Sequence, residues 1–165
     1  MSDQSEAFAE GIDFAVVAYR EEGQWQVEQI VLDQIEDIDS LANELRRWPG
    51  DGGALGMVSV DEDFFLLVRV AGATSKVLLS DITAATDWPI ARSAVEFLDL
   101  PLPEDEDDQV PAGDIDILTD LGMGAMDMSA LLDDYDLYPD EMLGDIASRI
   151  GFGAQFDEVV GVPAS

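Results

Sequence analysis

The residues of this chain that could do chemistry are almost all carboxylates. The 165 residues include 37 aspartates and glutamates but no histidine and no cysteine. Two carboxylates can act as general acid and base, or cleave glycosidic bonds, when a cleft fixes their separation and raises one pKa. Among 37 carboxylates a pair arises anywhere by chance, and aromatic residues, which would signal a sugar-binding cleft, make up only 8% of the chain. The composition favours solvated surface acids, and we assign no catalytic residue.

The densest group of oxygen ligands lies at residues 133–141, with the sequence DDYDLYPDE. A calcium loop of the EF-hand type needs acidic residues at positions 1, 3 and 5 and glycine at position 6. Counted from Asp134, position 3 is Asp136, but positions 5 and 6 are Tyr138 and Pro139. The pattern therefore does not predict an EF-hand. We expect no cofactor and no dedicated metal site, while weak divalent-cation binding stays open.

A second candidate is the glycine-rich run at residues 50–56, GDGGALG, which could in principle cradle phosphate. A phosphate-binding loop of the P-loop type continues with Lys-Ser or Lys-Thr and opens a helix. Neither feature follows here, and Asp51 would repel phosphate. We interpret the run as a helix-to-strand connection that needs positive φ angles.

The elements that would position any site follow from the spacing of apolar residues. The spacing predicts strands at residues 12–19, 25–32, 55–60, 64–70 and 76–79, and helices at residues 38–48 and 89–98. Residues 64–68, FFLLV, are continuously apolar, so their strand should be central and buried on both faces. We therefore expect an α+β fold, with an antiparallel five-stranded sheet and two helices in the order ββαβββα. That order resembles the roadblock and longin folds, in topology only.

The composition changes near residue 100 and suggests how the chain is divided. Prolines at positions 101, 103 and 111 flank the acidic run EDEDD, which is typical of a solvated linker. Residues beyond it combine acidic and apolar side chains at helical spacing. We predict disordered ends at residues 1–10 and 158–165, an α+β domain at 11–100, a linker at 101–112, and an acidic helical module at 113–157.

The net charge of −30 limits the partners. The chain repels the phosphates of nucleic acids and of anionic lipids, and it attracts basic proteins. The acids are uneven, since 17 of them and no basic residue lie between Arg92 and Arg149. The first ten residues lack the basic segment of a signal peptide, and no apolar run could span a bilayer. We expect a cytoplasmic protein that binds a basic protein, without direct contact to nucleic acid or membrane.

The apolar side chains of the acidic module could anchor such a partner. Apolar anchors ringed by charge are typical of an interface, because anchors supply affinity and charges speed the encounter. The alternative is that the same side chains pack back on the sheet, and the pattern leaves both open. The residues that we select as a candidate interface are Met123, Met126, Asp136, Leu137, Tyr138 and Asp140.

Three segments, at residues 50–70, 78–91 and 111–152, resemble the bacterial tRNA adenosine deaminase-associated protein family. The most distinctive motifs are LTDLGM at residues 118–123 and DLYPDE at residues 136–141. The similarity extends from about Phe14 to Phe156. The family name refers to a gene beside that of a tRNA-specific adenosine deaminase, so the resemblance implies an accessory role and no catalytic residues.

A zinc adenosine deaminase needs a His-x-Glu motif and a Pro-Cys-x-x-Cys motif. This chain has neither histidine nor cysteine, so it cannot be the deaminase itself. The leading hypothesis is a non-catalytic protein that binds that deaminase. The alternatives are an acidic nucleic-acid mimic that inhibits a nucleic-acid-binding protein, and a carboxylate-based enzyme that depends on a divalent ion.

Overall fold

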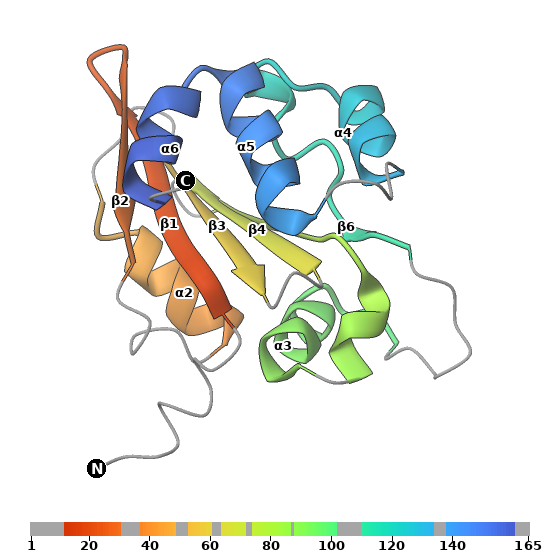
Figure 1. The fold of residues 1–165 in the computed structure, drawn as a ribbon. Helices are drawn as coiled ribbons and strands as arrows, with labels where there is room; N and C mark the ends of the chain where they lie inside the picture. The colour runs from red at the N-terminus through yellow and green to blue at the C-terminus, as the bar shows by residue number, and fades with distance from the viewer. Residues whose placement is uncertain are drawn as a thin grey trace.

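A computed structural model shows a single antiparallel sheet between two layers of helices (Figure 1). The structure describes residues 12–30, 37–48, 53–60, 64–71, 74–86, 88–101, 110–133 and 138–160. Six strands form the sheet in the order β2-β1-β3-β4-β5-β6. Their bounds are β1 Ile12–Glu21, β2 Gln24–Gln29, β3 Ala54–Val60, β4 Phe64–Ala71, β5 Thr74–Leu79 and β6 Ala112–Gly113.

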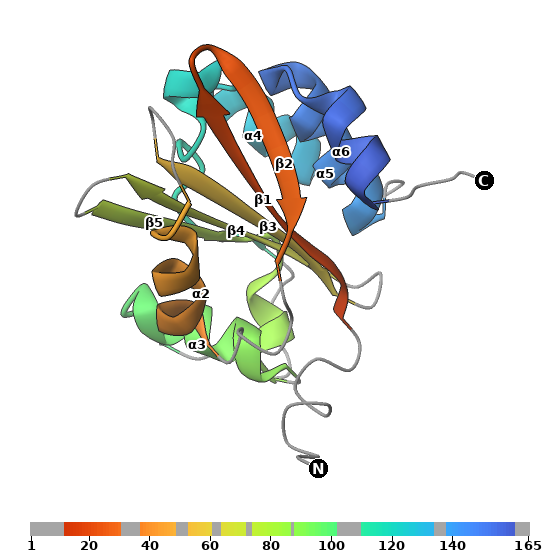
Figure 2. The ribbon, with the colours of Figure 1, turned by 90° about the vertical axis from the view of Figure 1, so that its left-hand side faces the viewer.

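The helices cover both faces of the sheet. Figure 2 shows α2 and α3 on one side of the strands and α4, α5 and α6 on the other. The helices are α2 Ile38–Leu45, α3 Pro89–Phe97, α4 Ala125–Leu132, α5 Pro139–Ile150 and α6 Gly153–Val160, with 3-10 turns η2 Ile82–Thr86 and η3 Thr119–Leu121.

The two central strands supply apolar side chains to both layers. All seven residues of β3 and the first seven of β4 are buried. Along β4, Phe64 and Leu66 enter the core under α2 and α3. The alternating residues Phe65 and Leu67 enter the core under α4–α6. This confirms that the FFLLV strand is central and buried on both faces.

The α+β class, the antiparallel sheet and the order of the first hundred residues are confirmed. The counts of five strands and two helices were wrong, because the described residues contain six strands and five helices. The sixth strand, β6, pairs only two residues with β5, through Leu78–Gly113 and Leu79–Ala112. Two residues are too few to produce a periodic pattern in the sequence.

The extra helices come from the acidic C-terminal part, which lies directly on the sheet. Phe152 stacks on Trp25 of β2 with ring centroids 4.9 Å apart, and Phe156 meets Phe14 of β1 edge-on at 5.7 Å. Gln155 Nε2 donates a hydrogen bond of 3.3 Å to the Trp25 carbonyl. The described residues of the expected domain and of the expected acidic module therefore share one hydrophobic core.

Some expectations fall outside the described residues. These are the disordered N-terminus, most of the linker, and the last five residues of the chain. Helix α6 continues to Val160, beyond the boundary that we expected at residue 157. Within the described ranges, no helix is long and apolar enough to cross a membrane.

A matched pair of substitutions measures how much the second helical layer stabilises the fold. Phe152→Ala is expected to lower the free energy of unfolding by about 3–5 kcal/mol, since the side chain is fully buried. Phe97→Ala, at a side chain 39% exposed, is expected to cost about 1 kcal/mol or less. Urea unfolding followed by tryptophan fluorescence measures both. Equal stabilities of the two variants would show that the layer containing α6 is not integral to the fold.

Candidate functional site

The structure separates the residues of the candidate interface. Met123 is fully buried in the core under α4–α6, whereas Met126 is 87% exposed and Tyr138 is 57% exposed. Asp140 is exposed in the first turn of α5. Asp136 and Leu137 lie outside the described residues. Packing against the sheet is therefore observed for Met123, whereas Met126, Tyr138 and Asp140 are exposed and stay candidates for an interface.

The first turn of α4 lies beside the last turn of α5. The Asp127 carboxylate in the first turn of α4 lies 4.0 Å from the Arg149 guanidinium in the last turn of α5. Met126 therefore lies near the end of α5, and Tyr138 immediately precedes its start. Since α5 has 12 residues, the two exposed side chains are separated by about 18 Å along the helix axis. They belong to one surface, but they cannot line one small pocket.

The outward face of α4–α6 is acidic. Arg149 is the only basic residue after Arg92 in the sequence, and it already contacts two carboxylates, with Asp145 Oδ2 3.1 Å from its Nε. The other described acids on these helices and their caps are exposed: Asp133, Asp140, Glu141, Asp157 and Glu158. These five residues, together with exposed Asp127, Met126 and Tyr138, form what we call the acidic face.

The basic residues gather elsewhere. Five of the seven lie at one end of the sheet: Arg20 on β1, Arg46 and Arg47 after α2, Arg69 on β4 and Lys76 on β5. Arg69 and Lys76 are directly opposite each other on neighbouring strands. Arg46 Nη2 donates a 2.8 Å hydrogen bond to Ser75 Oγ, which ties the end of α2 to β5. Sequence reasoning missed this cluster, because the five residues are scattered between positions 20 and 76.

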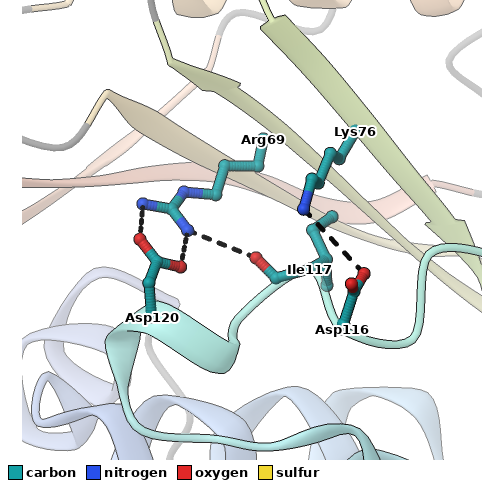
Figure 3. A network of polar contacts seen from close by, with 5 residues as sticks. All are labelled: Arg69, Lys76, Asp116, Ile117 and Asp120. Atoms are coloured by element: carbon teal, nitrogen blue, oxygen red, sulfur yellow. Dashed lines mark hydrogen bonds and ion pairs between the residues drawn. The ribbon is translucent and has the colours of Figure 1, made fainter.

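Among the residues that the structure describes, Arg69 is the one charged residue that is buried, with 9% of its surface exposed. Its two terminal nitrogens, Nη1 and Nη2, donate hydrogen bonds to the Asp120 carboxylate, with 2.9 Å between Nη2 and Oδ2. Nη1 also donates to the Ile117 carbonyl at 3.2 Å (Figure 3). Lys76 Nζ lies 3.9 Å from Asp116 Oδ1. The segment that carries both carboxylates leads from β6 into η3, so the two pairs hold the start of the second layer on the sheet.

The hydrogen bonds from Arg69 lower the pKa of Asp120 below its usual 3.8, against an opposing effect of partial burial. The same charges line an open groove of about 430 Å³ with Ala71, Thr74 and Thr119. Its two cations, Arg69 and Lys76, face two anions, Asp116 and Asp120. Because these charges balance, we interpret the groove as part of the structural network.

The described residues contain no group of three or more acidic side chains placed to hold a metal ion. A second groove, of about 350 Å³, lies between α2 and α3 and is lined by Asp37, Asp39 and Glu96 beside Arg92 and Phe97. Asp37 has a structural role there, since its side chain accepts from the Ser40 N–H and caps α2.

The Arg69–Asp120 pair predicts a pH dependence of stability. A carboxyl whose folded-state pKa is lowered stabilises the fold above its ordinary pKa, and the contribution is lost as pH falls through the folded value. Asp120→Asn is therefore expected to lower the free energy of unfolding at neutral pH by about 1 kcal/mol, discounted because the carboxylate is mostly solvated. The difference from the unmodified protein should begin to shrink as pH falls through the ordinary value of 3.8, and it should vanish only below the lowered pKa of the folded state.

Chemical denaturation across this pH range measures the effect, with Asp116→Asn as the control. The control pair is 3.9 Å apart with both side chains substantially exposed, so its loss should change stability by about 0.5 kcal/mol or less. A difference between Asp120→Asn and the unmodified protein that is the same at every pH would contradict the assignment.

Comparison with known proteins extends the sequence resemblance. Residues 13–153 match the family model described as Rv3753c-like tRNA adenosine deaminase-associated protein. Protein Rv3753c of Mycobacterium tuberculosis (strain ATCC 25618 / H37Rv) is 37% identical to this chain over 150 residues, which are 89% of this chain and 87% of that protein. No solved structure is similar to the chain. The matched region runs from β1 to the start of α6, so it covers the sheet, the Arg69 network and most of the acidic face. On this evidence the chain belongs to the family of Rv3753c-like tRNA adenosine deaminase-associated proteins.

Proposed function

We propose that this protein is a non-catalytic accessory protein that binds a basic protein partner through its acidic face. The family description, which associates these proteins with a tRNA adenosine deaminase, makes that enzyme the first candidate partner. We place the interaction in the cytoplasm, where tRNA modification occurs, and propose no direct contact of this chain with nucleic acid.

The observation that carries the proposal is the separation of charge. Five basic residues gather at one end of the sheet, and the helices α4–α6 keep one basic residue, which is paired internally. The field of the acidic face is therefore not neutralised from within. Such a surface attracts and orients a basic partner, and it repels nucleic acid. An enzyme that binds tRNA must itself present a basic surface to the phosphates.

Within the acidic face, Met126 and Tyr138 provide exposed apolar surface, and Asp140 provides charge. We keep Asp136 and Leu137, which precede Tyr138 in the sequence, as further candidates for the same interface. Met123 supports the surface from below, because it is buried in the core beneath α4 and α5. Partner contact should therefore depend on Met123 only through folding.

A non-catalytic role agrees with the residue types of the chain. Without histidine or cysteine it lacks the usual general base, and it lacks the zinc ligands that deaminases of this class use. The partner would supply the chemistry, and this chain would influence its stability, location or access to tRNA.

Isothermal titration calorimetry with the tRNA-specific adenosine deaminase of the same organism tests the proposal. We expect saturable binding in low-salt buffer that weakens steeply with added salt, because the Debye length falls from about 10 Å at 0.1 M to about 3 Å at 1 M. Absence of binding at low salt would contradict this choice of partner. Binding that does not respond to salt would contradict the electrostatic basis.

Two matched charge reversals locate the surface. Asp140→Lys changes an exposed acid in the first turn of α5, and Asp39→Lys changes an exposed acid in the first turn of α2, on the opposite face of the sheet. Both lose the same favourable interaction with a helix dipole, so their stabilities should fall alike. Only Asp140→Lys should weaken deaminase binding, by about tenfold, mainly through slower association. Equal losses for both variants would indicate a non-specific effect of net charge.

A further inference from the structure

Helix α4 is unusual among the helices of the acidic face, because apolar residues lie on both of its sides. Met128, Leu131 and Leu132 point into the core and are buried. Met126 and Ala130, one turn apart, are exposed. A surface helix normally turns polar residues outward, and a helix that is apolar all round is normally buried. On α4, Met126 and Ala130 therefore form exposed apolar surface beside Asp127, whose carboxylate lies 4.0 Å from the Arg149 guanidinium.

The charges around α4 also depart from the usual arrangement. Asp127 lies in the first turn, where a negative charge is favourable, but Asp133 is the C-terminal cap and the last turn contains no basic residue. The C-terminal end of a helix carries partial negative charge, so an aspartate there adds to a potential that a lysine or arginine would normally reduce. Local rules are most often broken at functional sites. The negative potential at this end of α4 is suited to a cation from outside the chain.

We propose that the outward side of α4 is the docking element, and that it seats Met126 in an apolar pocket with lysine or arginine at its rim on a basic partner protein. This rests on the proposed function and makes it more specific. Met126 provides the apolar anchor, and its flexible thioether side chain adapts to irregular pockets. Ala130 is small enough to let the partner approach the helix closely, and Asp133 meets the basic rim.

The other exposed apolar side chains fit this role less well. Met126 has the largest exposed fraction among the large apolar residues that the structure describes, at 87%. Tyr138 caps α5, and its backbone N–H donates to Glu141 Oε1 at 2.9 Å, so its position is explained by the helix start. Phe97, the last residue of α3, and Leu100, which follows that helix, are each 39% exposed and lie outside the acidic face. Charge and apolar surface coincide most clearly on α4.

Three variants test the proposal by calorimetry against the tRNA-specific adenosine deaminase. Met126→Gln keeps the length and helix propensity of the side chain while removing its apolar character. Ala130→Gln adds bulk where we expect close approach. Phe97→Gln is the control, since it removes an exposed apolar side chain from the opposite layer. Circular dichroism and thermal unfolding of the free proteins confirm that each variant is folded.

Met126→Gln and Ala130→Gln are each expected to weaken binding at least about tenfold, as for residues that anchor an interface. The dependence of affinity on salt should stay the same, because neither change alters the charge. Phe97→Gln should bind within about twofold of the unmodified protein. If the unmodified protein binds and all three variants bind equally well, the docking role of α4 is wrong and the proposed function stands. If the unmodified protein does not bind, both proposals fail.

Hydrogen exchange of the complex provides an independent measurement. We expect the backbone amides of α4 to exchange more slowly in the complex than in the free protein. Slower exchange confined to α2 and α3 would overturn the proposal even if the affinities of the variants agreed with it.

Discussion

The fold depends on one constraint, which is that β3 and β4 are apolar on both faces. Each face of such strands must be covered by another layer, because exposing either face to water would lose the hydrophobic free energy that burial provides. Helices α2 and α3 cover one face closely. A Cβ added to Gly56 of β3 would lie 3.1 Å from Leu45 Cδ1 of α2. Among the described residues, the acidic C-terminal part supplies the apolar side chains that cover the second face.

That requirement gives the acidic helices two roles. Leu143, Ile146 and Phe156 turn inward and complete the core, so the carboxylates of the same helices must turn outward. The packing of the core thus determines that the acidic side chains of these helices face the solvent. The outer surface of the second helical layer is therefore strongly negative. Where this layer begins, Asp120 and the Ile117 carbonyl satisfy the buried guanidinium of Arg69, which would otherwise be costly to bury. The helices α4–α6 therefore carry both part of the hydrophobic core and the surface that we propose for partner binding.

The acidic helical module that we predicted at residues 113–157 packs on the sheet as the second helical layer (Figure 2). Because prolines and an acidic run precede this module, the sequence suggested a separate unit there. The helical spacing of apolar residues within this module agrees with α5, which extends from Pro139 to Ile150. Met126 could be selected as a candidate because it is apolar among acids. Neither its exposure nor the burial of Met123, three residues earlier, could be predicted, because both depend on how this segment meets the sheet.

The sequence by itself determined the element order of the first hundred residues, the central position of β4, the excess of acid after Arg92 and the family. These properties are local, since they depend on composition and on periods of two or 3.6 residues along the chain. Only the tertiary structure decided that the C-terminal helices cover the second face of the sheet, and that Met123 is core while Met126 is surface. It alone brought five distant cations to one end of the sheet and placed Asp120 beside Arg69. Those facts depend on contacts between residues far apart in the sequence, and no local pattern encodes which distant side chains will meet.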